Sequence, residues 1–155
     1  MSSTLKKVAK EYPVVLVHGP RQSGKTPICR AVFSDKPYVS MENPDTRSRA
    51  LEDPRGFLAD FPNGVILDEI QRTPNLLSYM QQIVDEKKQN GFFILTGSDN
   101  FSLQQITSQS LAGRIALLTL LPFSMKEIKS ETWLTGTDKR ILYGGYPRLI
   151  TETPD

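Results

Sequence analysis

Residues 19–26 read Gly19-Pro20-Arg21-Gln22-Ser23-Gly24-Lys25-Thr26 and match the pattern G-x-x-x-x-G-K-S/T. Glycines at these positions let the backbone wrap closely, so that successive amide N–H groups face inward and form an anion-binding nest. A helix that begins near Lys25 adds the positive end of its dipole. We expect Lys25 to reach the β- and γ-phosphates of a nucleotide and the Thr26 hydroxyl to bind Mg²⁺. All eight residues are therefore candidate nucleotide-binding residues.

The segments around this loop alternate between strand and helix patterns. Strands are predicted at residues 14–17, 37–41, 65–67, 92–95 and 115–121, because each is a short apolar run. Helices are predicted at residues 4–11, 25–33, 45–61 with a break near Pro54, 76–88 and 123–131, and residues 101–112 fit either a helix or a loop. Apolar strands that alternate with helices are typical of a mostly parallel sheet covered on both faces. The sequence thus predicts an α/β fold.

An acidic pair, Asp68-Glu69, directly follows the apolar run Val65-Ile66-Leu67. In a doubly wound sheet the carboxyl ends of the strands face the ligand crevice. We expect Asp68 to hold Mg²⁺ through its water shell. We expect Glu69 to act as the general base that polarises the water attacking the γ-phosphate. Such a pair alone often only caps the next helix, and the phosphate-binding loop is what favours the catalytic interpretation.

A polar triplet, Thr96-Gly97-Ser98, ends the predicted strand at residues 92–95. A hydroxyl there would lie between the acidic strand and the phosphate-binding loop. We expect Thr96 to sense the γ-phosphate or to orient the attacking water, with Ser98 as its substitute. The alternative is a turn with a capping serine.

Three arginines are further candidates with open roles. Arg114 could neutralise charge in the transition state, in its own site or in a neighbour's, or it could pair with a surface carboxylate. Arg72 follows the acidic pair closely, and ion pairing explains it equally well. Arg21 lies in the loop itself and is expected to face solvent.

Composition excludes several classes of protein. The chain has 155 residues, which favours one domain, and its net charge of +2 does not indicate a nucleic-acid partner. No apolar run approaches the roughly 20 residues of a membrane span, so no membrane association is expected. Cys29 is the only cysteine, and His18 the only histidine, so neither a disulfide nor a metal cluster is expected. A reducing, cytoplasmic location fits this pattern.

The order of these motifs resembles the ATPase domain of a prokaryotic family of AAA-type P-loop ATPases. Members of this family pair the domain with a C-terminal domain of unknown function. The matching stretches are residues 19–26, Leu67-Asp68-Glu69-Ile70-Gln71-Arg72, Leu95-Thr96-Gly97-Ser98, Leu111-Ala112-Gly113-Arg114, Leu121-Pro122-Phe123-Ser124 and Gly144-Gly145-Tyr146-Pro147.

The resemblance implies a P-loop three-layer sandwich around a five-stranded, mostly parallel sheet. The acidic strand and the sensor strand would lie on one side of the loop strand. It also implies ATP and Mg²⁺ as ligands, with the loop and the acidic pair as Walker A and Walker B motifs. Residues 1–135 would then form the ATPase domain and residues 136–155 the start of a linker to a missing C-terminal region. Pro27 and Asp99 depart from the family pattern, and Pro27 is expected to push Thr26 toward extended geometry.

The leading functional hypothesis is an ATPase whose hydrolysis changes the conformation of an attached domain or partner. A protein partner or self-association stays open in this hypothesis. Two alternatives remain: a nucleotide-binding module with weak catalysis, for which Pro27 is the argument, and a small-molecule kinase. No arginine-bearing lid is recognisable between residues 95 and 115, which disfavours the kinase.

Overall fold

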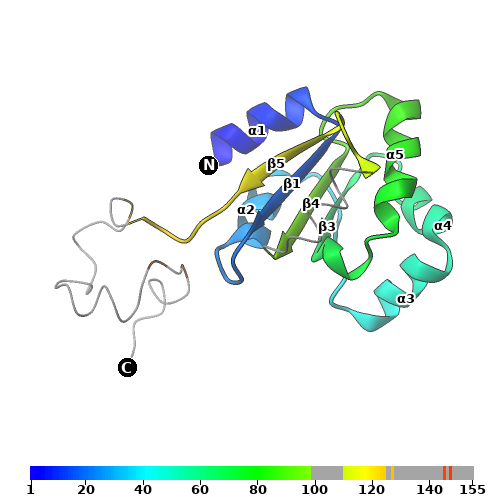
Figure 1. Ribbon diagram of the computed structural model, residues 1–155, viewed down its shortest axis with the longest axis horizontal. Helices are drawn as coiled ribbons and strands as arrows, with labels where there is room; N and C mark the ends of the chain where they lie inside the picture. Colours follow the sequence, from blue (N-terminus) through cyan, green and yellow to red (C-terminus); the bar gives the residue numbers. More distant parts are fainter. Residues whose placement is uncertain (99–109, 125–126, 128–144, 146, 148–155) are drawn as a thin grey trace.

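A computed structural model describes residues 1–98, 110–124, 127, 145 and 147 of the chain. In these residues five parallel strands form one sheet in the order β2-β3-β4-β1-β5 (Figure 1). The strands are β1 (Val14–Gly19), β2 (Tyr38–Ser40), β3 (Val65–Asp68), β4 (Phe93–Ser98) and β5 (Ile115–Thr119). The predicted α/β class is confirmed, and β3 and β4 lie on the same side of β1, as the resemblance implied.

Helices cover both faces of the sheet and give three layers. They are α1 (Ser2–Glu11), α2 (Lys25–Val32), α3 (Pro44–Glu52), α4 (Pro54–Ala59) and α5 (Leu76–Lys87), with a short 3-10 helix, η1 (Ile70–Arg72), after β3. The helical segment is interrupted between α3 and α4 where predicted, and Pro54 is the first residue of α4. The longest described helix, α5, has 12 residues, and none of the described helices is long and apolar enough to cross a membrane.

The alternation of side chains along β1 divides the core into two halves. Val15 and Val17 pack on the face covered by α1 and α2, together with Leu5, Ala9 and Cys29. Val14 and Leu16 pack on the opposite face, which α3, α4 and α5 cover with apolar side chains. Because successive residues of a strand point to opposite faces, a fully apolar strand such as β1 is expected only between two covering layers.

The strand β4 differs from its predicted extent. The polar residues Thr96, Gly97 and Ser98 belong to the strand, because they pair with the last three residues of β1. The triplet therefore extends the sheet beside the phosphate-binding loop instead of forming a turn. Most of the segments predicted at residues 101–112 and 123–131, and Asp99, lie outside the described residues.

Gly64 is the residue before β3, the strand that leads to the acidic pair. Its φ angle is 87°, and a Cβ atom there would lie 2.1 Å from the carbonyl oxygen of Phe92. That same oxygen accepts a hydrogen bond of 3.2 Å from the Val65 amide, where the pairing of β3 with β4 begins. Gly113 also has a positive φ angle, 73°, but no atom lies within 4 Å of the place of its Cβ.

We expect Gly64→Ala to lower the free energy of unfolding by about 3 kcal/mol or more, because it adds a steric clash to the left-handed backbone. Gly113→Ala is the matched control and should cost about 1 kcal/mol, the backbone contribution alone. Urea unfolding of both variants measures the difference. Equal losses would show that the contact with Phe92 is not what requires glycine at residue 64.

Candidate nucleotide-binding site

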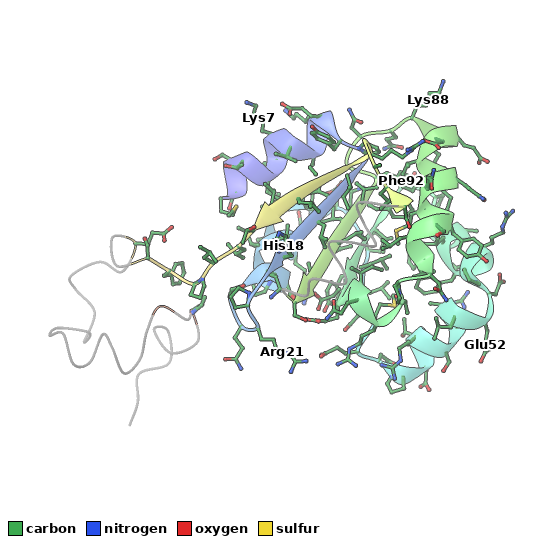
Figure 2. All side chains as sticks on the ribbon, in the orientation of Figure 1. Lys7, His18, Arg21, Glu52, Lys88 and Phe92 are labelled. Carbon is green, nitrogen blue, oxygen red and sulfur yellow. The ribbon has the colours of Figure 1, made fainter. Side chains whose placement is uncertain are left out.

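The loop between β1 and α2 turns through two left-handed residues. Gln22 has a φ angle of 62° and Gly24 one of 91°, so that α2 begins at once with Lys25. The Lys25 side chain is buried, and its Nζ donates to the carbonyl oxygens of Gly19 at 3.0 Å and Pro20 at 2.6 Å. The ammonium group is therefore held against the loop. Figure 2 shows that Arg21 projects outward from this loop, and its side chain is exposed.

The loop offers hydrogen-bond donors that suit phosphate. The Ser23 hydroxyl is buried and has no hydrogen-bond partner among the described residues. The first N–H groups of a helix have no partner within the helix, and the α2 N-terminus leaves them at the loop. A buried hydroxyl, amide N–H groups and the Lys25 ammonium together form the donor set that a triphosphate requires.

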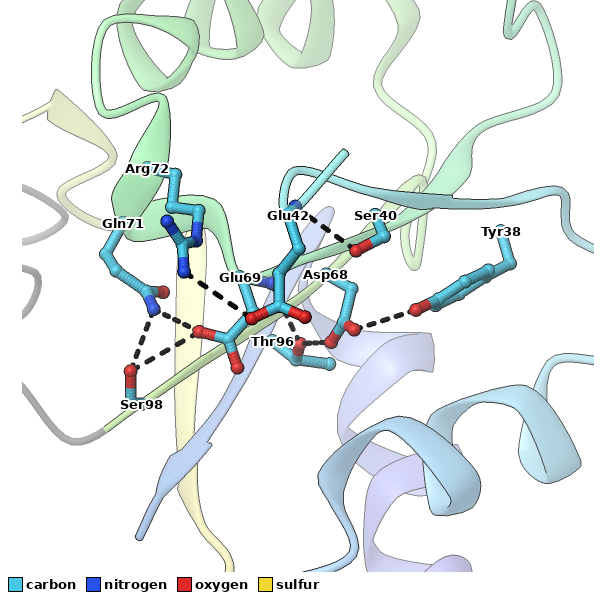
Figure 3. Close-up of polar contacts among 9 residues, drawn as sticks. All are labelled: Tyr38, Ser40, Glu42, Asp68, Glu69, Gln71, Arg72, Thr96 and Ser98. Atoms are coloured by element: carbon cyan, nitrogen blue, oxygen red, sulfur yellow. Dashed lines mark hydrogen bonds and ion pairs between the residues drawn. The ribbon is translucent and has the colours of Figure 1, made fainter. Parts of the chain in front are cut away.

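Asp68 ends β3 and is buried at the carboxyl edge of the sheet. Its Oδ1 accepts hydrogen bonds from the Thr26 hydroxyl, at 2.8 Å, and from the Thr96 hydroxyl. Its Oδ2 accepts from the Tyr38 hydroxyl at 2.8 Å (Figure 3). Hydroxyl and carboxylate oxygens are the ligands that Mg²⁺ prefers, so Thr26 and Asp68 fit the metal that the sequence led us to expect.

Tyr38 is a member of the site that the sequence analysis missed. Burial, reinforced by the hydrogen bond to Asp68, raises the pKa of Tyr38 from 10.0 to about 12. The Arg30 guanidinium lies over the Tyr38 ring, 4.8 Å from its centroid. The neutral phenol is therefore the form that donates to Asp68.

Glu69 follows Asp68 in a left-handed conformation, with a φ angle of 58°. Such a conformation is uncommon for a residue other than glycine, and it turns the chain from β3 into η1. The Glu69 Oε2 accepts hydrogen bonds from the Gln71 amide and from the Ser98 hydroxyl, the latter at 3.3 Å. The Gln71 Nε2 also donates to the Ser98 hydroxyl at 2.8 Å, so these three side chains form one cluster (Figure 3).

The two candidate sensor hydroxyls contact different acidic side chains. Thr96 is fully buried, donates to Asp68 and accepts from the Glu69 backbone N–H at 3.3 Å. Ser98 lies two residues nearer the carboxyl edge and contacts the Glu69 side chain. Both residues lie on the same face of β4, and a strand rises by about 3.3 Å per residue, which separates their hydroxyls.

A pocket of about 340 Å³ joins the loop to Glu69. Its lining residues are Gln22, Gly24, Lys25, Thr26, Pro27, Glu69 and Pro147. Pro147 comes from the part of the sequence that was expected to be a linker. A Cβ atom on Gly24 would lie 3.6 Å from the Pro147 ring, and the carbonyl of Gly145 accepts from the Phe123 amide at 2.7 Å. Pro147 thus contributes to the wall of this pocket.

Pro27 does not act on Thr26 as the sequence predicted. Thr26 is helical, because α2 runs without interruption from Lys25 through Pro27 to Val32. A proline in the first turn of a helix needs no N–H partner, which makes this position tolerant. The Thr26 hydroxyl still reaches Asp68, so the expected displacement toward extended geometry is wrong.

Arg114 lies near the amino-terminal ends of the strands, at the opposite end of the sheet from the loop. Its carbonyl accepts from the Val14 amide at 3.1 Å, where β1 begins, whereas the phosphate-binding loop follows the end of β1. The Arg114 Nε and Nη2 atoms bind the two Asp85 carboxylate oxygens at 2.5 and 2.9 Å. The structure therefore does not bring Arg114 into its own site. Arg72 is 3.5 Å from Glu42 and forms an exposed ion pair.

A buried cysteine lies behind the loop. Cys29 is on the sheet-facing side of α2 and is fully inaccessible to solvent. Burial, with a smaller contribution from the charge of Asp68, raises the pKa of the Cys29 thiol to about 12. The thiol is thus protonated at neutral pH and behaves as a small apolar core group.

A phosphate-binding loop at the end of a central parallel strand, with an acidic pair at the end of β3, defines a P-loop nucleotide-binding domain. The sequence profile of the AAA domain family (AAA_14) matches residues 11–129. The chain therefore belongs to this family of P-loop ATPase domains, as the resemblance implied.

Two curated proteins are similar to most of this chain. The uncharacterized proteins Rv2008c of Mycobacterium tuberculosis and Mb2031c of Mycobacterium bovis are each 33% identical over 152 residues, or 97% of this chain. The chain spans only 33% of the length of these relatives.

Among solved structures, AMPPCP-bound DnaA of Aquifex aeolicus matches with a TM-score of 0.63 and 15% identity, covering 96% of this chain and 55% of that one. The Walker-type ATPase PABY2304 of Pyrococcus abyssi matches with a TM-score of 0.53 and 18% identity, covering 81% of this chain and 53% of that one. These likenesses support the fold. Family and fold together suggest nucleotide binding and hydrolysis.

We expect Tyr38→Phe to remove a contribution to stability that is present at neutral pH and is lost at high pH. The folded chain keeps the Tyr38 proton up to about pH 12, whereas an unfolded tyrosine loses it near pH 10. The stabilisation by Tyr38 is thus fully present below about pH 10 and is lost as the pH rises toward 12. The free energy of unfolding of the wild type and the variant should differ by a constant amount below pH 10 and converge above it.

Urea unfolding at a series of pH values measures this convergence. Tyr12→Phe, which removes an exposed ring hydroxyl from the end of α1, is the matched control. A difference between wild type and Tyr38→Phe that does not change with pH would contradict the hydrogen bond to Asp68 as its source.

Proposed function

We propose that this chain binds ATP with Mg²⁺ and hydrolyses the bond to the γ-phosphate. The observation that carries the proposal is the convergence of Lys25, Thr26 and Glu69 on one pocket, with Asp68 bonded to Thr26 at its side. These residues come from two separate sequence signals, the phosphate-binding loop and the acidic pair, and each has the chemistry that the reaction needs.

The phosphate-binding loop supplies the binding of the triphosphate. The Ser23 hydroxyl and the N–H groups at the start of α2 would donate to phosphate oxygens. Lys25 would exchange its hydrogen bonds to the Gly19 and Pro20 carbonyls for the β- and γ-phosphates. The exchange replaces neutral acceptors by charged ones, and charge-assisted hydrogen bonds are roughly twice as strong.

Thr26 and Asp68 would hold the metal ion. When bound, Mg²⁺ neutralises negative charge that accumulates on the phosphate oxygens. The hydroxyls of Tyr38 and Thr96 fix the orientation of the Asp68 carboxylate before any ligand arrives. Their role is that of positioning groups, which reduce the reorganisation needed on binding.

Glu69 would act on the attacking water. Its carboxylate accepts a proton from the water while the water oxygen attacks the γ-phosphorus, and the bond from that phosphorus to the bridging oxygen of ADP breaks. The products are ADP and inorganic phosphate, and the proton leaves Glu69 for solvent. Thr96, or Ser98 in its place, would sense the γ-phosphate, and the hydrogen bond from Ser98 to Glu69 supports the second choice.

Hydrolysis would change the conformation of an attached domain or a partner protein. Two features that join the loop to other parts of the chain support this: the hydrogen bond from Thr26 to Asp68, and the pocket that the loop shares with Pro147. A ligand that binds one arrangement of these contacts better than another shifts the population toward it. A protein partner or a second copy of the chain fits this proposal, and so does a cytoplasmic location.

The two alternatives are separated by direct assays. A nucleotide-binding module with weak catalysis would bind ATP without releasing phosphate. A small-molecule kinase would release phosphate only poorly and would transfer it to an added acceptor. The geometry favours the ATPase, because Glu69 faces the same pocket as Lys25.

We expect Lys25→Ala to weaken ATP binding about 10- to 100-fold, because it removes hydrogen bonds to charged oxygens worth about 1.5–3 kcal/mol. Glu69→Gln should leave the affinity within about twofold and lower kcat by about 100-fold or more, as for the loss of a general base. Phosphate release and nucleotide titration measure the two quantities. Lys7→Ala and Glu86→Gln, on exposed residues of α1 and α5, are the matched controls.

Arg114 is tested through its partner Asp85. If the ion pair only joins α5 to the sheet, Arg114→Ala and Asp85→Ala should change turnover equally little at every protein concentration. If Arg114 acts in a neighbouring chain, turnover per chain should rise with concentration, and only Arg114→Ala should abolish the rise. Initial rates over a hundredfold range of protein concentration decide between the two.

A further inference from the structure

Gln71 lies in η1, two residues after Glu69. Its side-chain amide faces two acceptors, the Glu69 carboxylate and the Ser98 hydroxyl, the latter at 2.8 Å. A carboxylate only accepts hydrogen bonds, so the NH₂ end of the Gln71 amide must be the end that faces it. The orientation of this amide is therefore dictated by Glu69.

This orientation leaves the other end of the amide unsatisfied. The Gln71 Oε1 is buried and has no hydrogen-bond partner among the described residues. A buried acceptor without a partner destabilises a fold, and an apolar side chain of similar shape would avoid the loss. Gln71 is thus not the side chain that stability alone would place here.

A second unfavourable feature occurs at the same place. Glu69 itself is held in the left-handed region, at a φ angle of 58°, which a glycine or asparagine would adopt more easily. Both features act on a single group, because the left-handed turn aims the Glu69 carboxylate and the Gln71 amide holds it. Strain of this kind tends to collect at functional sites, where the surrounding structure maintains it.

The held carboxylate faces the phosphate-binding loop. Glu69 lines the same pocket as Lys25 and Thr26. The hydrogen bonds from Gln71 and Ser98 both reach Oε2, and neither is made to Oε1. One carboxylate oxygen is fixed, and the hydrogen bonds within this cluster leave the other oxygen for the reaction.

We propose that Gln71 is a positioning residue that, with Ser98, fixes the Glu69 carboxylate for its action on the attacking water. The inference rests on the proposed function, since it assigns Gln71 a part in the same hydrolysis. Ser98 belongs to β4 and Gln71 to η1, so the cluster also ties the base to the strand beside the loop. A displacement of Ser98 would move the Glu69 carboxylate through their own hydrogen bond and also through the hydrogen bonds of Gln71.

The test compares Gln71→Met with the wild type. Methionine has a similar length and no polar atom to leave unpaired, so the melting temperature should be unchanged or raised. We expect the affinity for ATP to stay within about twofold, because no contact to the loop is lost, and kcat to fall about tenfold or more. Gln82→Met is the matched control, because Gln82 is on α5 and, within the described part of the chain, its side chain bonds the exposed Arg55 alone, at 3.1 Å.

Coupling to Ser98 gives a second measurement. Ser98→Ala and Gln71→Met should be non-additive, so that the double variant is little slower than the slower single variant. Independent effects that multiply would overturn the cluster as one unit. A kcat within twofold of wild type in Gln71→Met, or a rise in kcat, would overturn the positioning role.

A third measurement does not depend on turnover. In ¹⁵N–¹H spectra the side-chain NH₂ signals of Gln71 should be displaced downfield by the carboxylate and should move back in Glu69→Gln. Signals that do not respond to Glu69→Gln would overturn the inference and leave the proposed function standing. Failure of the wild type to hydrolyse ATP would overturn the proposed function, and with it the role of Gln71 in hydrolysis. A parallel loss of melting temperature and kcat in Gln71→Met would show a structural role only.

Discussion

The burial of one carboxylate, that of Asp68, constrains most of the carboxyl edge of the sheet. A buried charge is costly unless polar groups surround it, and here three hydroxyls from α2, β2 and β4 do so. These three elements are far apart in the sequence, and only the parallel sheet order brings them together. Because each hydroxyl has to reach the same two oxygens, the start of α2 cannot shift relative to β3 without leaving a buried acceptor unpaired. The geometry of the phosphate-binding loop is therefore linked to the strand that carries the acidic pair.

Asp68 and Glu69 are adjacent in sequence but are directed to different neighbours. Asp68 still belongs to β3 and faces the hydroxyls of Thr26 and Tyr38. The left-handed conformation of Glu69 turns the chain, so that its carboxylate meets Gln71 and Ser98 instead. A regular extended residue at this position would send the second carboxylate to the opposite face of the sheet. The strained turn is thus what allows two consecutive acidic residues to act within one site.

The sequence predicted the parts of the site that are local. The loop at residues 19–26, the acidic pair and the apolar strands are contiguous patterns. The role of each can be inferred from its own residues and their immediate neighbours in the sequence. Tyr38, Gln71 and Pro147 could not be recognised in that way, because their contacts come from strand order and from the return of the chain to the loop. The extent of β4 was also underestimated, since polar residues such as Thr96 have no apolar pattern and are strand residues only through pairing with β1. The prediction for Pro27 was wrong because it used only the preference of a residue before proline for extended geometry. At the start of α2 the loop that precedes the helix sets the conformation of Thr26 instead.

The burial of Cys29 has a practical consequence for spectroscopy. It is the only cysteine of the chain, it is inaccessible to solvent, and its high pKa keeps it as an unreactive thiol. Thiol-directed reagents act on the thiolate, so they should pass over this residue while the chain is folded. Fluorophores or spin labels can then be attached through cysteines introduced at exposed positions without first replacing the native one. Distances between helices and strands can thus be measured with such labels while Cys29 stays in the core.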